Sequence, residues 1–359
     1  MNVMYLLFSF TVGGIERLMV DVANGMSKKH NVTVCIINDY YSNELVNELN
    51  DNVNVILMKR PVGSGKIKCM VDILKEVKKV KPDVLHCQGM NCIQASILVK
   101  LLMPKVKIYN TVHDVNNYKK YNKFQVVLGN VMCRKIIAIS KAVEQEILHK
   151  AVPKNKVEVV FNAIDTDKFK PNLIKKLDKN NITLVNVARV YPEKKGQDLL
   201  VRAVAQLYKR GYNIKCIFAG EPMKGNVKYI DDLKALAKEL RVSDNVEFLG
   251  NVMNVPQVLE NADLFVLPSR FEGFGISIIE AMAMGKPCVV SNIEGPMEII
   301  SSDKLGYTFK NGDYADLTNK IELAINNYDS FDCEYIRNYV VSNYSVTNMI
   351  DKLERIYGE

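Results

Sequence analysis

Short apolar segments alternate with segments of helical spacing along the whole chain of 359 residues. Most of the apolar segments are continuous rather than alternating in polarity, which is typical of parallel strands covered on both faces. They lie at 2–8, 32–37, 53–58, 84–87, 107–112, 135–139, 157–160, 182–188, 214–219, 246–249, 264–267, 287–290 and 306–309. This alternation predicts βαβ units and therefore an α/β protein with doubly wound parallel sheets.

Helical spacing is clearest at 16–27, 67–80, 197–210, 228–240 and 276–284. Residues 169–181 break the alternation, because they contain a proline, several lysines and an Asn-rich end. We therefore predict a linker at 169–181 between two Rossmann-like domains that face a cleft. They are an N-terminal domain at 1–168 and a C-terminal domain at 182–343. A closing helix at 344–359 is expected to pack back on the first domain.

The net charge of +8 is unevenly distributed. Residues 1–170 hold 25 Lys and Arg against 15 Asp and Glu, whereas residues 171–359 hold 23 against 25. A basic half of this kind favours contact with something anionic. A solvated basic surface explains the charge alone equally well.

Several classes of protein are disfavoured by composition. The eight cysteines form no C-x-x-C and mostly lie in apolar runs, so they indicate buried thiols in a reducing compartment. The four histidines show no metal-binding spacing, so we expect no metal. The apolar segment at 1–10 lacks a basic flank and a cleavage pattern, and no uncharged stretch approaches the roughly 18 residues of a membrane span. We expect a cytoplasmic protein that at most lies on the inner face of the membrane.

Three motifs follow predicted strands, where ligands of such sheets collect. The first is Gly13-Gly14-Ile15-Glu16, which opens the first helix. Two glycines allow backbone N–H groups to approach a ligand closely, and a helix N-terminus favours an anion. A plain strand-to-helix turn is the alternative.

The second motif runs from Arg189 to Gly196 and follows the first strand of the second domain. Its cations Arg189 and Lys195 would lie at the edge of that sheet. Two fixed cations suit a diphosphate, because a leaving phosphate gains negative charge as its bond breaks. A solvated loop is the alternative.

The third motif runs from Ser269 to Met282. Gly273 and Gly275 flank Phe274 and could expose consecutive N–H groups as an anion-binding nest. Glu272 precedes a largely apolar helix and Glu280 lies inside it. A carboxylate in such a segment needs a strong partner, which sugar hydroxyls or a structural cation would supply.

These motifs together resemble the family-4 retaining glycosyltransferases. The shared pattern is an N-terminal Gly-Gly-x-Glu, then Arg-…-Lys-Gly, then Glu-Gly-Phe-Gly with a second glutamate eight positions after the first. It covers nearly the whole chain in the family's order and includes Asn162-Ala163-Ile164-Asp165, where the family usually has Gly in place of Ala163. The resemblance implies a GT-B fold, a nucleotide-sugar donor held mainly by the second domain, and no requirement for a cofactor or metal.

The resemblance also implies roles for the motif residues. Arg189 and Lys195 would neutralise the donor diphosphate, Glu272 would bind hydroxyls of the transferred sugar, and Glu280 would bind the ribose. The backbone around Gly273, Phe274 and Gly275, with Gly14 from the first domain, would complete the donor site.

Residues for the acceptor are expected on the first domain. His113, followed by Asp114, ends a strand and matches the family's His-Asp, which implies a position beside the donor sugar and the acceptor hydroxyl. His86 and Gln88 end another strand, and Glu16 opens the first helix. We assign these three to the acceptor pocket.

Two stretches, 59–81 and 118–128, combine lysines with apolar residues. Such surfaces bind anionic headgroups, so we expect a glycan or lipid-linked acceptor at an anionic membrane. Solvated helix faces are the alternative. No nucleic-acid signature accompanies the lysines.

The sequence therefore favours a retaining glycosyltransferase of bacterial surface polysaccharide or glycolipid synthesis. A GT-B epimerase or phosphorylase and a non-catalytic sugar-nucleotide-binding scaffold subunit stay open as alternatives.

Overall fold

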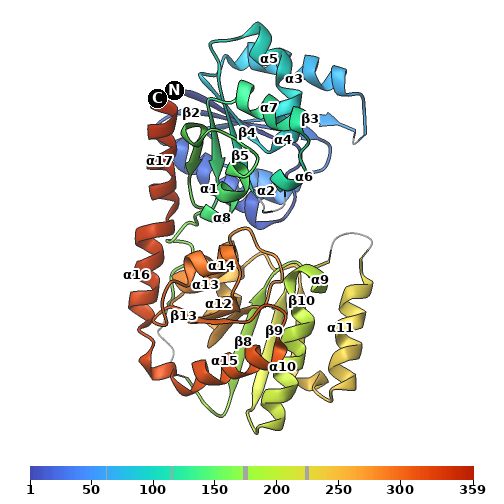
Figure 1. Cartoon of the computed structure of the whole chain (residues 1–359), viewed down its shortest axis with the longest axis vertical. Coiled ribbons are helices and arrows are strands. Elements are labelled where there is room, and N and C mark those ends of the chain that lie inside the picture. Colours follow the sequence, from blue (N-terminus) through green and yellow to red (C-terminus); the bar gives the residue numbers. More distant parts are fainter. Residues whose placement is uncertain (62, 114, 116, 173–176, 223–225) are drawn as a thin grey trace. The chain divides into compact units, whose positions relative to one another are not determined.

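The computed structural model of the protein describes residues 1–61, 63–113, 115, 117–172, 177–222 and 226–359 (Figure 1). The chain divides into two compact units. Unit 1 consists of Met1–Ala163 and Val346–Glu359, and unit 2 of Ile164–Ser345.

Unit 1 is built on a seven-stranded parallel sheet with the strand order β3-β2-β1-β4-β5-β6-β7. The strands are β1 (Asn2–Leu7), β2 (Asn31–Asn38), β3 (Val53–Arg60), β4 (Val84–Gln88), β5 (Lys107–Val112), β6 (Lys135–Ala138) and β7 (Val157–Val159). The helices are α1 (Gly14–Met26), α2 (Asn43–Asn47), α3 (Lys66–Val80), α4 (Met90–Ala95), α5 (Ile97–Leu102), α6 (Asn117–Lys120), α7 (Lys123–Met132), α8 (Lys141–Leu148) and α17 (Val346–Gly358).

Unit 2 is built on a six-stranded parallel sheet with the strand order β10-β9-β8-β11-β12-β13. The strands are β8 (Ile182–Val187), β9 (Ile214–Ala219), β10 (Val246–Gly250), β11 (Leu264–Leu267), β12 (Cys288–Ser291) and β13 (Gly306–Phe309). The helices are α9 (Pro192–Lys195), α10 (Gln197–Lys209), α11 (Lys228–Glu239), α12 (Val255–Glu260), α13 (Ile276–Ala283), α14 (Glu294–Ile299), α15 (Tyr314–Asn326) and α16 (Cys333–Tyr344).

The predicted α/β class with doubly wound parallel sheets is confirmed in both units. In each sheet the winding direction reverses beside the first strand, between β1 and β4 in unit 1 and between β8 and β11 in unit 2. Ligands of doubly wound sheets bind beyond the carboxyl ends of the strands at such a reversal. The order of the strands therefore defines where a site is expected in each unit.

Helix α17 is the last helix of the chain and belongs to unit 1, where it packs against α1. It buries Met349, Ile350, Leu353, Ile356 and Tyr357. A Cβ at Gly25 of α1 would collide with the side chain of Ile350. The absence of a side chain at Gly25 therefore permits the close approach of the two helices.

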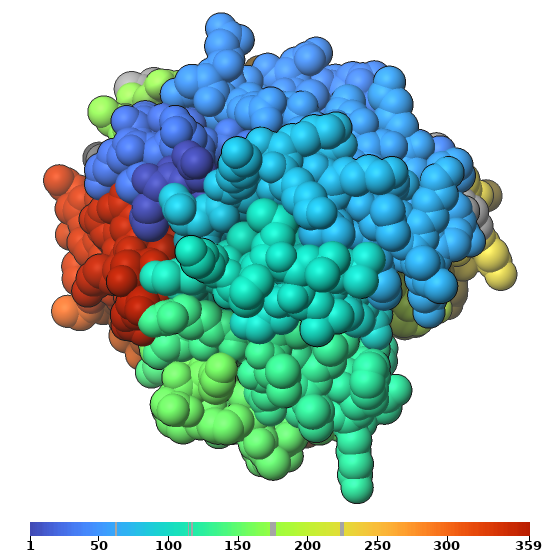
Figure 2. All heavy atoms as spheres, turned by 90° about the horizontal axis from the view of Figure 1, so that it is seen from above, coloured from blue at the N-terminus to red at the C-terminus, as the bar shows by residue number. Residues whose placement is uncertain are grey.

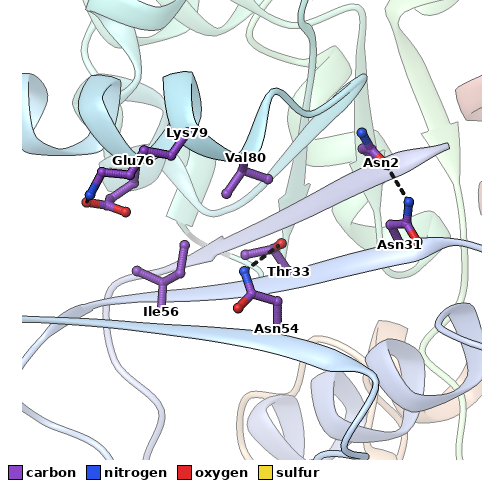
Figure 3. Close-up of a pocket in the computed structure, with 8 residues that line it drawn as sticks. All are labelled: Asn2, Asn31, Thr33, Asn54, Ile56, Glu76, Lys79 and Val80. Atoms are coloured by element: carbon purple, nitrogen blue, oxygen red, sulfur yellow. Dashed lines mark hydrogen bonds and ion pairs between the residues drawn. The ribbon is translucent and has the colours of Figure 1, made fainter.

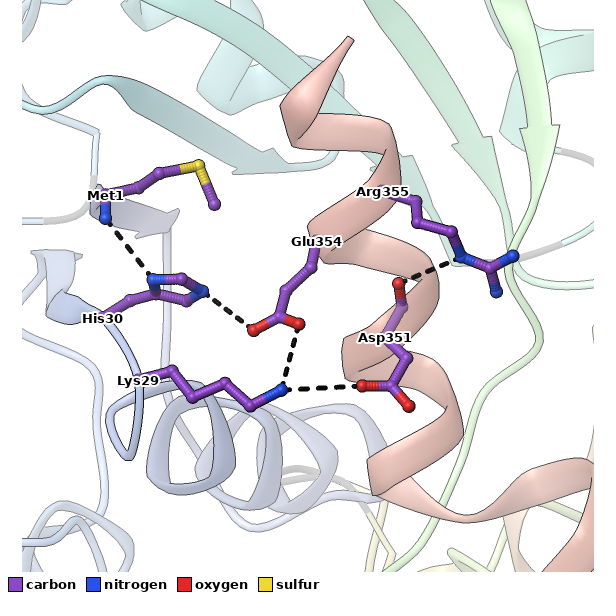
Figure 4. A network of polar contacts seen from close by, with 6 residues as sticks. All are labelled: Met1, Lys29, His30, Asp351, Glu354 and Arg355. Atoms are coloured by element: carbon purple, nitrogen blue, oxygen red, sulfur yellow. Dashed lines mark hydrogen bonds and ion pairs between the residues drawn. The ribbon is translucent and has the colours of Figure 1, made fainter.

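An ionic network fixes the exposed side of α17 (Figure 4). Glu354 accepts hydrogen bonds from Lys29 at 3.2 Å and pairs with His30 at 2.8 Å, and Asp351 lies 3.7 Å from Lys29. Burial alone would raise the pKa of Glu354, but the bonds from Lys29 and His30 outweigh it and lower the pKa. The carboxylate is therefore held in its charged form.

Residues 164–181 belong to unit 2, including the described parts of the predicted linker, 169–172 and 177–181. Residues 173–176 of that linker lie outside the described residues. Arg337 of α16 donates hydrogen bonds to the backbone oxygens of Thr166, Phe169 and Ala283. Ile164 and Ser345, which bound unit 2, pair in an isolated bridge.

Every helix in the described ranges is too short or too polar to cross a bilayer.

Candidate active site

The predicted donor residues meet at the reversal point of the unit 2 sheet. Strand β8 leads into Arg189 and the short helix α9, which ends with Lys195. The neighbouring strand β11 leads into the loop 268–275 that contains Glu272. Two segments far apart in sequence therefore deliver two cations and a carboxylate to one edge.

Lys195 and Glu272 form an ion pair with 2.5 Å between Nζ and Oε2. Their side chains are 19% and 15% exposed, so the pair is partly shielded but reachable. Charges of opposite sign in such surroundings attract more strongly than at an open surface. The guanidinium of Arg189 is not part of this pair, and the residue is exposed.

The loop that carries Glu272 is held by polar contacts. The hydroxyl of buried Ser269 donates to Glu272 at 3.3 Å. Arg270 makes a bidentate contact with Asp198 of α10, with both bonds at 2.8 Å, and also donates to the backbone oxygen of Pro192. The hydrogen bonds that Arg270 donates to Asp198 raise the pKa of Arg270, so this cation stays charged. Fork-like pairs of this type fix geometry as well as charge.

Glycines bring the same segments close together. Gly196 has φ +67°, and a Cβ there would overlap the backbone oxygen of Pro268. Gly275 has φ +104° and precedes α13. A Cβ at Gly295 of α14 would lie 2.8 Å from the backbone of Glu272, Gly273 and Phe274. The loop 268–275, which we call the Glu272 loop, thus rests against backbone on two sides.

The other residues of the third motif are inside unit 2. Gly273 and Gly275 are buried, and the ring of Phe274 is buried in an edge-on contact with Tyr344 of α16. Phe274 therefore anchors the loop by its side chain, and only its backbone is suited to a ligand. Glu280 lies on α13 with 8% exposure.

In unit 1, three predicted residues lie at the carboxyl ends of the adjacent strands β1, β4 and β5: Gly14 after β1, Gln88 as the last residue of β4, and His113 directly after β5. Gly14 is exposed at the start of α1, and Glu16 is half-buried in its first turn. His113 Nε2 lies 2.6 Å from Oε1 of Gln88. Because that oxygen only accepts, the ring proton lies on Nε2 and Nδ1 is left as an acceptor.

Burial lowers the pKa of His113 to about 4, so the ring is neutral at physiological pH. Nδ1 is buried and has no hydrogen-bond partner among the described residues. A buried acceptor of this kind is suited to a donor hydroxyl from a ligand. Asp114, the second residue of the His-Asp motif, lies outside the described residues.

His86 has a different environment from the one expected for an acceptor pocket. It is 2% exposed, and its Nδ1 and Nε2 lie 2.5 Å from the hydroxyl of Tyr357 and 2.7 Å from that of Thr111. Burial and the nearby His113 lower its pKa to about 3. Both ring nitrogens are used inside unit 1, where His86 joins β4 to α17, because His86 is the central residue of β4 and does not lie at its carboxyl end.

A cavity of about 490 Å³ lies at the opposite edge of the unit 1 sheet (Figure 3). Asn2, Asn31 and Asn54 line it near the amino ends of their strands, with Glu76 and Lys79 of α3 beside them. Asn31 donates to Asn2 at 2.9 Å and Asn54 donates to Thr33 at 3.3 Å. None of the predicted site residues lines this cavity.

The sequence did not indicate Asp198, Ser269 or Gly295 as parts of the site. Ser269 lies in the third motif, so its position could have suggested a role. Asp198 resembles any acidic residue in the first turn of a helix, and Gly295 resembles any helical glycine. Their partners become visible only when distant segments meet.

The protein thus has two doubly wound α/β units. At the point where the winding of the unit 2 sheet reverses, two cations and a carboxylate form a site suited to a sugar diphosphate. Two family models match the chain. The model described as Glycosyltransferase Family 4 matches residues 12–168, and the model described as Glycosyl transferases group 1 matches residues 167–340. The chain belongs to the family-4 glycosyltransferases, which are nucleotide-sugar-dependent enzymes of the GT-B fold.

Two curated relatives match over most of their length. The Escherichia coli UDP-Gal:alpha-D-GlcNAc-diphosphoundecaprenol alpha-1,3-galactosyltransferase is 24% identical over 81% of this chain and 79% of its own. The Staphylococcus aureus capsular polysaccharide biosynthesis glycosyltransferase CapM is 26% identical over 83% and 82%.

Among solved structures, Anabaena HepE in complex with UDP and glucose superposes with a TM-score of 0.85 at 19% identity, over 100% of both chains. This likeness establishes the fold. The predicted GT-B fold is therefore confirmed.

Proposed function

We propose that this protein is a retaining glycosyltransferase that moves a sugar from a UDP-sugar to a glycan or lipid-linked acceptor in bacterial surface polysaccharide or glycolipid synthesis. The observation that carries the proposal is the Lys195–Glu272 ion pair, which lies where the winding of the unit 2 sheet reverses. It joins a cation for the diphosphate to a carboxylate for the sugar. The E. coli relative is named for a UDP-sugar and a lipid diphosphate acceptor, which supports both substrate classes.

In this proposal Arg189 and Lys195 bind the donor diphosphate and stabilise the charge that develops on the leaving phosphate. Glu272 exchanges its bond to Lys195 for hydroxyls of the transferred sugar, with Ser269 and Arg270 keeping its loop in place. Glu280 binds the ribose, and the backbone at Gly273, Phe274 and Gly275 faces the phosphates. Gly14 offers a backbone amide at the start of α1.

Retention of configuration is proposed to follow from transfer on one face of the sugar, with the leaving phosphate helping to deprotonate the acceptor. The unprotonated Nδ1 of His113 would accept a hydrogen bond from a sugar hydroxyl. Gln88 fixes the tautomer that makes this possible. Glu16 is proposed to contact the acceptor.

We further propose that transfer requires no metal ion, since Arg189 and Lys195 would supply the positive charge at the diphosphate. Turnover should then persist when EDTA is present. Loss of activity in EDTA that added Mg²⁺ restores would contradict this part. The proposed place of action is the cytoplasmic face of the membrane, where a lipid-linked acceptor would be met.

A thermal-shift panel with UDP, ADP, GDP and their glucose conjugates tests donor binding. A ligand that binds only the folded state raises the melting temperature, so UDP and a UDP-sugar should stabilise the protein more than the ADP forms. A flat panel would overturn the donor assignment. Binding of a UDP-sugar without turnover on lipid-linked or soluble glycan acceptors would favour a scaffold subunit instead.

A further inference from the structure

Among the described residues of unit 1, six large apolar side chains on three helices are more than half exposed, and we call them the apolar face. Their exposed fractions lie between 59% and 77%. They are Ile67 on α3, Leu101 and Leu102 on α5, and Phe124, Val127 and Val131 on α7. Single exposed apolar residues are common, but a group on neighbouring helices marks an interaction surface.

Helix α7 shows that core packing does not explain this surface. Phe124, Val127 and Val131 are spaced by three and four positions, so they share one side of the helix. Val126, Gly129 and Met132 are buried on the opposite side. A helix that is apolar on both sides is normally covered on both. The described residues of unit 1 cover only one side of α7.

The three helices lie on one face of unit 1. Helix α3 packs against α5, and α4 packs against both α5 and α7. Figure 2 shows these segments side by side in a view onto unit 1, from the blue of α3 through the cyan of α5 to the blue-green of α7. The apolar residues therefore act together and not as isolated positions.

Positive charge surrounds the apolar face. Helix α3 contains five Lys against two acidic residues, and residues 84–143 contain nine Lys and Arg against one acidic residue, Asp114. Lys68, Lys105, Lys120 and Lys123 are exposed on or beside the helices that form the face. A second copy of this chain would bring these like charges together, whereas an anionic bilayer presents the opposite charge above an apolar interior.

We propose that the apolar face inserts into the acyl boundary of an anionic membrane, with the surrounding lysines at the level of the lipid phosphates. Its biological purpose, access to a lipid-linked acceptor, rests on the proposed function. Insertion differs from simple electrostatic adsorption, because salt screens surface charges but does not weaken apolar burial. Binding to vesicles should therefore decrease with salt without disappearing.

The chain contains no tryptophan, which permits a site-specific test of insertion. In a Phe124→Trp variant the single indole should shift to shorter wavelength when vesicles of phosphatidylglycerol and phosphatidylcholine are added. Lipids with brominated acyl chains should quench it. The matched control is Tyr208→Trp on α10 of unit 2, also exposed, which should show neither effect. Equal behaviour of the two variants, or no response at position 124, would overturn the proposal.

Flotation of the full-length protein with the same vesicles tests the surface as a whole. The triple variant Phe124→Ser, Val127→Ser and Val131→Ser should partition at least about tenfold less than the wild type, because it removes most of the apolar area that α7 would bury. The control variant Tyr208→Ser with Leu323→Ser removes exposed apolar side chains from unit 2 and should float like the wild type. Unchanged flotation of the triple variant would overturn insertion.

Sedimentation velocity without lipid tests the competing possibility that the apolar face joins two copies of this chain. A wild-type dimer that the triple variant converts to a monomer, together with no vesicle binding, would make the face an interface between copies and would overturn the membrane proposal. The thermal shift with UDP distinguishes a failure of membrane insertion from a failure of the proposed glycosyltransferase function. The triple variant should retain that shift, and a protein that floats but shows no shift with any nucleotide would contradict the proposed function while supporting insertion.

Discussion

At the scale of single residues, the contact between Lys195 and Glu272 brings the second and third sequence motifs together in one site. Lys195→Ala removes the cation that would face the leaving phosphate. Loss of one charge-stabilising group commonly costs a few kcal/mol, so turnover should fall by at least about tenfold. Steady-state kinetics with saturating donor and acceptor would measure this. Lys209→Ala at the exposed end of α10 is the control, and unchanged turnover in Lys195→Ala would contradict its assigned role.

The hydroxyl of Tyr357 supports a second prediction at this scale. Tyr357→Phe leaves Nδ1 of buried His86 without its partner at 2.5 Å. A buried polar atom that loses its partner costs about 1–3 kcal/mol of stability. Urea unfolding should show a decrease of that size, whereas Tyr335→Phe, at an exposed position, should have almost no effect. Equal stability of the two variants would show that His86 does not depend on α17.

The sequence supplied the types of the site residues but not their partners. The sequence allowed us to predict Arg189, Lys195 and Glu272 as site residues, because these charged residues come soon after predicted strands. His86 satisfied the same criterion, yet its side chain lies in the core with Tyr357, which is 271 positions away. His86 lies two residues before Gln88 on the same face of β4, so the distance from the carboxyl end of the strand, which the apolar pattern does not fix, decides that His86 lies in the core and Gln88 at the edge.

At the scale of elements, the contact between α14 and the Glu272 loop leads to a third prediction. Gly295→Ala places a Cβ about 2.8 Å from the backbone of the Glu272 loop, so the loop must shift. Because Gly295 has no left-handed backbone conformation, the change adds no strain of its own. We expect kcat/KM to fall by at least about tenfold, in line with the cost of small displacements of positioned groups.

Gly65→Ala is the matched control for this variant, since a Cβ there meets nothing within 4 Å and the residue lacks a positive φ. It should leave kcat/KM and the melting temperature unchanged. Wild-type kinetics in Gly295→Ala would indicate that the loop tolerates the displacement and that its position is not critical.

The elements themselves were largely predictable. All thirteen predicted strands occur, with ends that differ by at most two residues, because strands covered on both faces are continuously apolar. The predicted helices end within two residues as well. The outward side of α7 could not be separated from its buried side by composition, because both are apolar and the packing of neighbouring elements, α4 among them, decides which is covered.

At the scale of the whole molecule, two neutral histidines, buried His86 and partly buried His113, make stability depend on pH. Burial lowers the pKa of His113 to about 4 and that of His86 to about 3, below the value of about 6.5 in an unfolded chain. The unfolded chain therefore binds more protons, so stability is lost as the pH falls below about 6.5. Each histidine contributes up to about 1.4 kcal/mol per pH unit, down to its folded pKa.

Urea unfolding between pH 7 and pH 5 would measure this slope. His113→Gln removes one titrating group and should reduce the loss of stability over that range, while His149→Gln should not, because His149 lies on the exposed end of α8. A slope that is the same in wild type and His113→Gln would contradict neutral burial of His113.

The position of α17 has a consequence for synthesis. Unit 2 is one continuous segment, Ile164–Ser345, whereas unit 1 needs both the beginning of the chain and Val346–Glu359. Unit 2 is therefore complete on the ribosome before unit 1, although unit 1 is translated first. Until α17 emerges, the nascent chain carries uncovered Tyr109 and His86 side chains, so a message truncated after codon 345 would yield a folded unit 2 and a unit 1 marked for proteolysis.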